Sequence, residues 1–267
     1  MPSPRQSSAE PRGTLTYIGG PTALLELCGL RLITDPTFDA AGTKYPSPTG
    51  AYALEKTMSP ALTVDQLGAV DVVLLSHDHH SDNLDVAGRA LVQHTPRVLT
   101  TIAGAERLGD NAMGLRAWES VVLPALDARE LRVTATPARH GPEGGDRGPV
   151  IGFVLEPSHP SNGSVYVTGD TVWYEGVAEV ARRFSVGTVI AFMGAARVRA
   201  VGPSHLTLTA EEGVELARAF PDATIIPLHF EGWTHFSEGR AEIGTAFAHA
   251  GLAARLRWPV AGRSVEL

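Results

Sequence analysis

Histidines and acids crowd one short segment of the chain, SHDHHSDNLD at residues 76–85. His77, His79 and His80 lie within four positions, and Asp82 follows two residues later. Imidazole nitrogens bind zinc, iron and related metals, and a carboxylate adds a harder oxygen ligand. A solvated turn with incidental histidines is the alternative, but such turns are rarely so dense in ligands. Because Cys28 is the chain's one cysteine, any metal must be held by histidines and carboxylates.

Three further candidate ligands each follow an apolar run that is typical of a buried strand. His140 comes after LRVTATPA, Asp170 lies in the turn TGDT after SVYVT, and His229 comes after TIIPL. Taken singly, each has an ordinary explanation: a surface-loop histidine, a turn former or helix cap, and a core histidine. Together they repeat the arrangement of the 76–85 segment, which follows VDVVLLS. Since sheets commonly gather sites at one edge, we expect these side chains to meet in one metal site.

Catalysis also needs groups that carry protons, and three residues are candidates. Asp82 could orient an attacking water or accept its proton. His235 lies in HFEGWTHF shortly after His229, where it could donate a proton or contact an anionic oxygen; a surface role is an equal alternative. His205, in GPSHLT, precedes a predicted helix and could reach the pocket, although loop histidines are more often only solvated.

Short apolar runs alternate with amphipathic stretches and must position these residues. Strands are expected at 14–19, 23–28 and 31–34 (an antiparallel meander), 70–76, 98–101, 120–123, 131–138, 150–156, 164–168, 188–193, 224–228 and 254–258. Helices are expected at 84–94, 102–108, 175–184, 209–219 and 238–250, the fourth opened by a capping box of Thr209 and Glu212. Residues 35–63 predict a long irregular loop. The order of these elements indicates a layered α/β fold, with packed sheets and outer helices.

Composition narrows the class of protein. Of the 267 residues, 43% are hydrophobic and 19% are charged, as is typical of a folded soluble protein. No stretch approaches the roughly 20 apolar residues that cross a bilayer, and a net charge of −7 disfavours nucleic acid and anionic membranes as partners. Residues 1–13 predict a disordered tail without a secretory signal, followed by one domain over 14–267. The single cysteine fits a reducing cytoplasm, and homo-oligomerisation stays open.

The order of the motifs resembles the metallo-β-lactamase fold superfamily, and within it the branch of L-ascorbate-6-phosphate lactonase-like proteins. The likeness runs over about residues 14–258 and includes the opening TYIGGPTALLELCGLRLITDP. It implies an αββα sandwich of two mixed β-sheets with helices on the outer faces. It also implies the ligand roles, with His77, His79 and His140 on a first metal, Asp170 bridging, and Asp82 and His229 on a second.

The family motif is His-x-His-x-Asp-His, and the chain departs from it. His77 and His79 match the first two positions. Without a gap, Ser81 stands in place of the aspartate and Asp82 in place of the last histidine. With one extra residue, Asp82 is the aspartate and Asn83 replaces the histidine, and the sequence that follows favours this alignment. In both alignments one histidine of the second metal site is missing, so a single-metal centre is an alternative to a pair.

The leading interpretation is a hydrolase that uses metal-bound hydroxide on an ester, lactone or related acyl bond of a small molecule. Zn2+ is the expected cofactor, as one or two ions, with Mn2+ or Fe2+ as alternatives; His80 is a candidate for the missing ligand. A phosphodiesterase of the phospholipase D-like type is the alternative enzyme, because related members of the fold resemble such enzymes. A non-catalytic metal-binding or sensing protein is the alternative of another class, since ligands alone do not make an enzyme.

Overall fold

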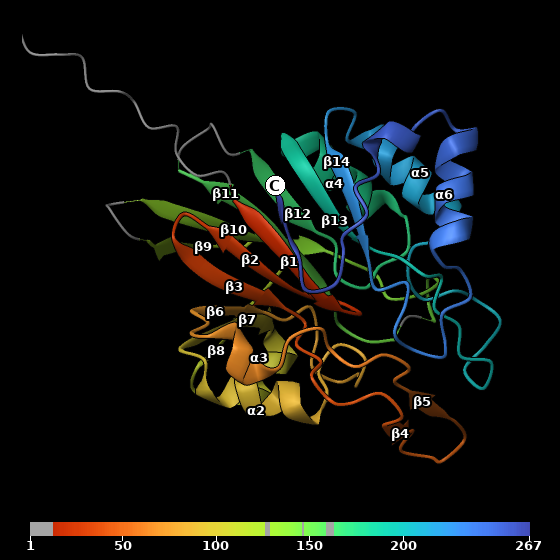
Figure 1. The fold of residues 1–267 in the computed structure, drawn as a ribbon, viewed down its shortest axis with the longest axis horizontal. Helices are drawn as coiled ribbons and strands as arrows, with labels where there is room; N and C mark the ends of the chain where they lie inside the picture. Colours follow the sequence, from red (N-terminus) through yellow and green to blue (C-terminus); the bar gives the residue numbers. More distant parts are fainter. Residues whose placement is uncertain (1–12, 126–128, 146, 159–162) are drawn as a thin grey trace, which may run out of the picture.

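Two β-sheets packed face to face form the centre of the computed structural model, and helices lie on both outer sides (Figure 1). The structure describes residues 13–125, 129–145, 147–158 and 163–267. The predicted tail at 1–13 therefore lies, apart from Gly13, outside the described residues. This arrangement confirms the predicted αββα sandwich.

The first sheet has seven strands in the order β15-β1-β2-β3-β6-β7-β8. Their bounds are β1 Thr14–Gly19, β2 Thr22–Leu27, β3 Leu30–Thr34, β6 Val72–Leu74, β7 Arg97–Thr101, β8 Ala112–Leu115 and β15 Ser264–Glu266. The predicted meander is confirmed, because β1, β2 and β3 pair antiparallel. From β3 to β8 the pairing is parallel.

The second sheet has six strands in the order β14-β13-β12-β11-β10-β9. Their bounds are β9 Ser120–Pro124, β10 Glu130–Pro137, β11 Ile151–Pro157, β12 Ser164–Val167, β13 Val186–Phe192 and β14 Thr224–Leu228. Strands β9 to β12 pair antiparallel, and β12 to β14 pair parallel. A separate hairpin of β4 (Lys44–Pro46) and β5 (Ala53–Glu55) lies within the predicted loop at 35–63.

Helices cover the outer face of each sheet. They are α1 Val64–Leu67, α2 Val86–His94, α3 Ile102–Leu108, α4 Glu175–Arg183, α5 Ala210–Ala219, α6 Arg240–His249 and the 3-10 helix η3 Ala253–Arg255. The predicted capping box opens α5, since the Thr209 hydroxyl accepts from Glu212 N–H and the Glu212 carboxylate accepts from Thr209 N–H. α2 packs on the first sheet, and α4, α5 and α6 pack on the second.

Alternating apolar side chains fill three layers. Leu25 and Phe153 point into the space between the sheets, where they pack in one buried cluster. Their neighbours Leu24 and Val154 point outward, into the clusters under α2 and under α4 to α6. Successive side chains of a strand face opposite sides, so strands buried on both faces are apolar without a break. This explains why runs such as VDVVLLS lack the alternation of a half-exposed strand.

The prediction of a last strand at 254–258 is wrong. The chain forms η3 there, and the last strand is β15, which pairs with β1. The physical reason is Arg255, whose guanidinium turns inward and donates to the carbonyl of Ala223 and to carbonyls at the end of α5. Leu256 then makes a single bridge to β14 rather than a ladder. β8 was also not predicted.

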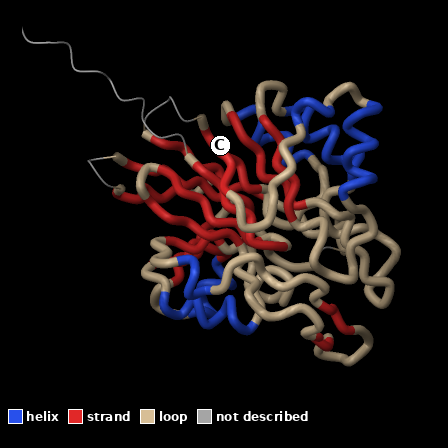
Figure 2. The backbone as a smooth tube through the Cα atoms, in the orientation of Figure 1, coloured by secondary structure: helices blue, strands red, loops and turns tan. Residues whose placement is uncertain are grey.

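Loops gather on one side of the two sheets (Figure 2, tan). Strands β3 and β6 are parallel in the first sheet, and β10, β12 and β14 share a direction in the second. The residues directly after these strands meet at that side, as described below. Among the described residues, no helix combines the length and the apolar character that crossing a membrane requires.

Candidate metal centre

All seven predicted metal ligands lie in one cluster at the ends of the strands. Three sets of ligand atoms, each within 4.8 Å of one another, are His77 with His79 and His80, His77 with His140 and Asp170, and Asp82 with Asp170 and His229. His77 belongs to the first two sets and Asp170 to the last two. The three sets therefore form one continuous group of donors, with Asp170 between its two halves.

The ring of His77 is fixed from behind by two other side chains. Its Nδ1 lies 2.9 Å from the Ser76 hydroxyl, which itself donates to Asp35 Oδ2 at 2.7 Å. Because the hydroxyl hydrogen goes to Asp35, the hydroxyl oxygen accepts from Nδ1–H of His77. The proton is thus on Nδ1, and the lone pair on Nε2 faces the cluster. Metal-binding histidines are commonly oriented in this way.

Backbone carbonyls fix two further rings. His140 Nδ1 lies 2.8 Å from the carbonyl of Leu206, and His79 Nε2 lies 2.8 Å from the carbonyl of Arg147. A carbonyl only accepts, so each of these nitrogens carries the proton. The other nitrogen of each ring, Nε2 of His140 and Nδ1 of His79, keeps its lone pair for a metal. His140 Nε2 lies 3.4 Å from Asp170 Oδ2.

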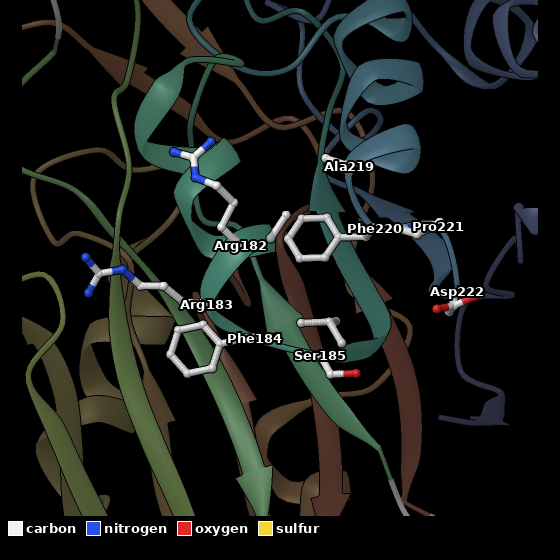
Figure 3. A pocket seen from close by; sticks show the side chains of 10 residues that line it. Arg182, Arg183, Phe184, Ser185, Ala219, Phe220, Pro221 and Asp222 are labelled. Atoms are coloured by element: carbon white, nitrogen blue, oxygen red, sulfur yellow. The ribbon is translucent and has the colours of Figure 1, made fainter.

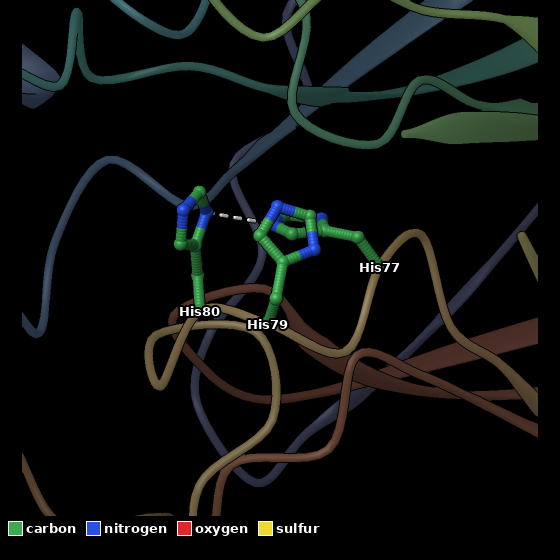
Figure 4. Close-up of side chains that lie close together, drawn as sticks. All are labelled: His77, His79 and His80. Atoms are coloured by element: carbon green, nitrogen blue, oxygen red, sulfur yellow. Dashed lines mark hydrogen bonds between the residues drawn. The ribbon is translucent and has the colours of Figure 1, made fainter. Parts of the chain in front are cut away.

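His80 lies beside His77 and His79 on the same loop (Figure 4). Its Nδ1 is 2.9 Å from His77 Nε2, the contact marked in Figure 4. Burial, together with the neighbouring His140, lowers the pKa of His80 to about 3. The ring is therefore neutral at physiological pH and has a lone pair that can bind a metal.

Two buried carboxylates and a buried histidine form the other half of the cluster. His229 Nε2 lies 3.4 Å from Asp170 Oδ1 and 3.5 Å from Asp82 Oδ2. Although burial disfavours the charged ring, the two carboxylates raise the pKa of His229 to about 10. His229 has a φ of 54°, which residues other than glycine rarely adopt, and such strain is concentrated at functional sites. The two carboxylates that raise the pKa of His229 also give the site a negative potential, which favours a cation.

Asn83 occupies the position where the preferred alignment expects the missing histidine. Its side-chain amide donates to Asp35 at 3.1 Å and to Asp170 at 3.3 Å. The same amide nitrogen cannot bind a metal, because it carries hydrogens and no free lone pair. Asn83 therefore orients two carboxylates, and the second half of the cluster has one nitrogen ligand, His229, and two carboxylates.

Buried ligand atoms that lie 3.4–3.5 Å from an opposite charge but make no hydrogen bond support a metal in this cluster. Among the described residues, Asp170 Oδ2 and both ring nitrogens of His229 are buried and make no hydrogen bond. Buried polar groups are almost always paired, so such atoms need a partner of another kind. A set of imidazoles and carboxylates fits zinc, iron or manganese. The donors present therefore fit a divalent metal ion.

The cluster opens into a pocket with apolar walls. His80, Asp82, His140 and His235 line it together with Tyr52, Leu54, Arg147, Ala196, Val198, Val201 and Leu206. The cavity is narrow, about 30 Å³, and adjoins a second hollow of about 280 Å³ that shares Tyr52, Leu54, His80 and Arg147. Another hollow, shown in Figure 3, lies where α4 and α5 end, near Arg182 and Phe220. None of the candidate ligands lines that hollow.

The predicted catalytic residues fall in two places. Asp82 and His235 face the pocket, and His235 Nε2 lies 3.0 Å from Asp82 Oδ2. His235 and His229 together lower the pKa of Asp82, although burial alone would raise it. His205 is not brought into this group: its Nε2 lies 3.0 Å from Glu212 of α5, and it is absent from the described pocket lining.

Two residues that help to position the ligands were not predicted. Asp35 follows β3 and accepts from the Ser76 hydroxyl that holds His77, and burial raises the pKa of Asp35 to about 7. It shares the pattern of the predicted ligands, a polar residue after an apolar strand, so the signal was present. Arg147 lies in a glycine-rich loop, and its carbonyl contact to His79 left no signal in the sequence.

Comparison with known proteins identifies the family. The β-lactamase superfamily domain matches residues 30–230 of the chain. The chain belongs to this superfamily. Its metallo-β-lactamase fold agrees with the resemblance inferred from the motifs, while membership of the L-ascorbate-6-phosphate lactonase-like branch stays a prediction.

Several relatives of this superfamily member are similar over most of their length. The UPF0173 protein YddR of Bacillus subtilis is 25% identical over 257 residues, which cover 94% of this chain and 98% of YddR. A UPF0173 metal-dependent hydrolase of Pelotomaculum thermopropionicum is 26% identical over 211 residues, or 74% of this chain and 82% of that protein. The structure of an isothiocyanate hydrolase from Delia radicum gut bacteria has the same fold, with a TM-score of 0.78, 24% identity, and coverage of 95% of this chain and 99% of the other. A protein named as a metal-dependent hydrolase is thus among the relatives that match most of this chain.

Proposed function

We propose that this protein is a metal-dependent hydrolase that cleaves an ester, lactone or related acyl bond of a small molecule, with zinc as its metal. One observation carries the proposal: the overlapping donor sets open directly into a narrow, apolar-walled pocket. The apolar side chains of this pocket, together with the adjoining hollow of about 280 Å³, suit the carbon skeleton of a small substrate. His80, Asp82 and His140 reach the pocket from the donor cluster, and His235 lines it beside Asp82.

The residues of the chain divide the work. His77, His79 and His140 would hold one ion, with His80 beside them, while Asp82 and His229 would hold a second and Asp170 would lie between. A bound divalent ion lowers the pKa of water from 15.7 to about 7 and so supplies hydroxide at neutral pH. Asp82 orients the attacking water, and His235, 3.0 Å from Asp82, is placed to give a proton to the leaving oxygen.

The comparison with the isothiocyanate hydrolase adds a substrate class to test, since that enzyme is named for a substrate with an electrophilic carbon. Attack of water on such a carbon resembles attack on an acyl carbon. A phosphodiester is the less favoured substrate, because several positive groups usually surround a phosphate and Arg147 is the permanent cation among the described lining residues.

The test combines metal analysis with a substrate panel. The purified chain, loaded with zinc, is assayed on δ-valerolactone, p-nitrophenyl acetate, phenethyl isothiocyanate and bis-p-nitrophenyl phosphate. We expect turnover of the acyl substrates, lost together with zinc in His77→Ala and kept in His249→Ala, which alters an exposed histidine of α6. Turnover of the phosphodiester alone would favour the phosphodiesterase, and bound zinc without any turnover would favour a sensor. Full turnover by His77→Ala would refute the ligand assignment.

A further inference from the structure

Arg147 is the positively charged residue that the proposed hydrolytic function leaves unused. It lines both the narrow pocket and the adjoining hollow of about 280 Å³. Its guanidinium makes no ion pair with any residue that the structure describes, and the residue is half-buried. Lys56, by contrast, pairs with Asp85 at 3.0 Å, and Arg139 lies 3.6 Å from Glu143. Among the residues that the structure describes, Arg147 is therefore a cation that lines a pocket without an ion-pair partner.

The backbone of Arg147 is tied to two candidate metal ligands. Its N–H donates to the carbonyl of His140 at 2.8 Å, and its carbonyl accepts from His79 Nε2–H at 2.8 Å. Gly148 follows with a φ of 103°, and a Cβ there would lie 3.0 Å from His79 Nε2. The glycine therefore allows the close approach of this loop to His79. These two hydrogen bonds fix the position of the Arg147 backbone next to the metal cluster, and with it the position from which the side chain extends.

Two of the walls around Arg147 are apolar, apart from the Tyr52 hydroxyl, and face the polar groups of the donor cluster. They come from the β4–β5 hairpin and from the segment 196–206, and consist of Tyr52, Leu54, Ala196, Val198, Val201 and Leu206. A hydrocarbon group in this space would be shielded from water on two sides. A guanidinium at the edge of such a space forms strong bidentate hydrogen bonds with a planar carboxylate.

We propose that Arg147 binds a carboxylate of the substrate, so that the substrates are compact apolar esters or lactones that carry one free carboxylate. This inference rests on the proposed hydrolytic function and names its substrate class. The apolar walls hold the carbon skeleton, and Arg147 orients it so that the acyl carbon faces His80, Asp82 and His140. A single guanidinium matches a single monoanion, whereas a phosphate dianion would leave charge unpaired in the same pocket.

Binding of substrate fragments to the zinc-loaded full chain tests the proposal without requiring turnover. The probes are 3-methylbutanoate, which has both parts, 3-methylbutanol and acetate, which each have one, and inorganic phosphate. Calorimetry should give 3-methylbutanoate the lowest Kd of the four. In Arg147→Gln that Kd should rise roughly tenfold to a hundredfold, the range for a hydrogen bond to a charged group. Arg147→Lys should recover part of the loss.

Arg199→Gln is the matched control, because Arg199 is exposed and lines a different hollow. It should leave the Kd of 3-methylbutanoate unchanged, and zinc content should be the same in all variants. An unchanged Kd in Arg147→Gln would mean that the carboxylate binds the metal alone and would overturn the proposal. So would tighter binding of phosphate or 3-methylbutanol, or loss of zinc in Arg147→Gln. Absence of turnover with intact fragment binding would count against the hydrolytic function alone.

In turnover, the proposal predicts a split between paired substrates. Monomethyl glutarate carries a free carboxylate, and methyl butanoate does not. Arg147→Gln should raise KM for the first roughly tenfold or more and leave KM for the second unchanged, with little change in kcat for either. Equal effects on both substrates would contradict a specific contact with the carboxylate.

Discussion

Replacing Ser76 with alanine removes one hydroxyl that joins a buried carboxylate to a candidate metal ligand. The hydroxyl donates to Asp35 Oδ2 at 2.7 Å and accepts from Nδ1–H of His77 at 2.9 Å. Alanine fits the same space, so the change deletes these two hydrogen bonds and little else. It therefore measures how strongly the residues behind His77 hold its ring in place.

The expected loss of stability follows from the two bonds. The bond to Asp35 is worth about 1.5 kcal/mol, the low end for a charged acceptor, because Ser76 N–H and Asn83 still donate to that carboxylate. The buried Nδ1–H of His77 loses its acceptor, which costs about 1–3 kcal/mol. Together the free energy of unfolding of the metal-free protein should fall by about 3 kcal/mol. Loss of such an orienting partner should also weaken zinc affinity about tenfold to a hundredfold.

Urea unfolding at pH 8, followed by tryptophan fluorescence, measures the change in the free energy of unfolding. Chelator competition measures zinc affinity. The pH lies above the value of about 7 to which burial raises the pKa of Asp35, so that this carboxylate is charged. Ser120→Ala is the control, since it removes a hydroxyl 2.9 Å from that of Thr134, far from the cluster, and should cost about 1 kcal/mol or less. The reasoning is refuted if Ser76→Ala loses no more stability than Ser120→Ala and binds zinc equally well.

Three further changes test other parts of the structure. Lys56→Met breaks an ion pair with Asp85 in which the two side chains are 4% and 0% exposed. The free energy of unfolding in urea should fall by about 3 kcal/mol. This is the low end for buried pairs, because two backbone N–H groups still bond Asp85. Although burial alone would raise the pKa of Asp78, Arg107 holds that pKa below its ordinary value. Arg107→Gln should therefore destabilise the protein at pH 7. The difference in stability from wild type should shrink as the pH falls below about 4, where Asp78 becomes protonated in the unfolded chain. Asn83→His should raise the zinc bound per chain, measured by mass spectrometry of the metal, because it restores a nitrogen ligand at the second half of the cluster.

Each of these changes has a control or a contrary result. Lys44→Met removes an exposed partner of Glu55 and should change stability by less than about 0.5 kcal/mol. Arg116→Gln removes an exposed pair with Glu119 and should show a much smaller loss at pH 7 than Arg107→Gln. The argument for Lys56 is contradicted if Lys56→Met loses no more stability than Lys44→Met. The argument for Arg107 is contradicted if the effect of Arg107→Gln is constant between pH 3 and 7. The argument for Asn83 is contradicted if Asn83→His binds no more zinc than wild type.

The sequence predicted those parts of the site that follow from local pattern. Apolar runs that end in a histidine or an aspartate predicted where His77, His140, Asp170 and His229 would lie, because each run is a buried strand and the strand ends meet at one side of the sheets. The strand at β3 ends in the same way, and Asp35 was overlooked because an aspartate before a proline is also typical of a turn.

Contacts between distant segments could not be predicted in the same way. Strand β15 pairs with β1, and a bridge joins Lys56 to Trp233, yet neither pairing has a local signal. The run at 254–258 has the composition of a short strand, and only the position of α5 in space explains why Arg255 turns toward its carbonyls instead. The backbone contacts of Arg147 belong to the same class, since any residue type has an N–H and a carbonyl to offer.

The central claim is that ligands from three separate segments, at His77, His140 and Asp170, bind a common cation. Crystals of the full chain grown with zinc, measured on both sides of the zinc absorption edge, test it most directly. We expect an anomalous peak about 2.0–2.2 Å from ring nitrogens of His77 and His140 and from a carboxylate oxygen of Asp170. Zinc bound only elsewhere on the protein, with no peak among these three side chains, would contradict the account.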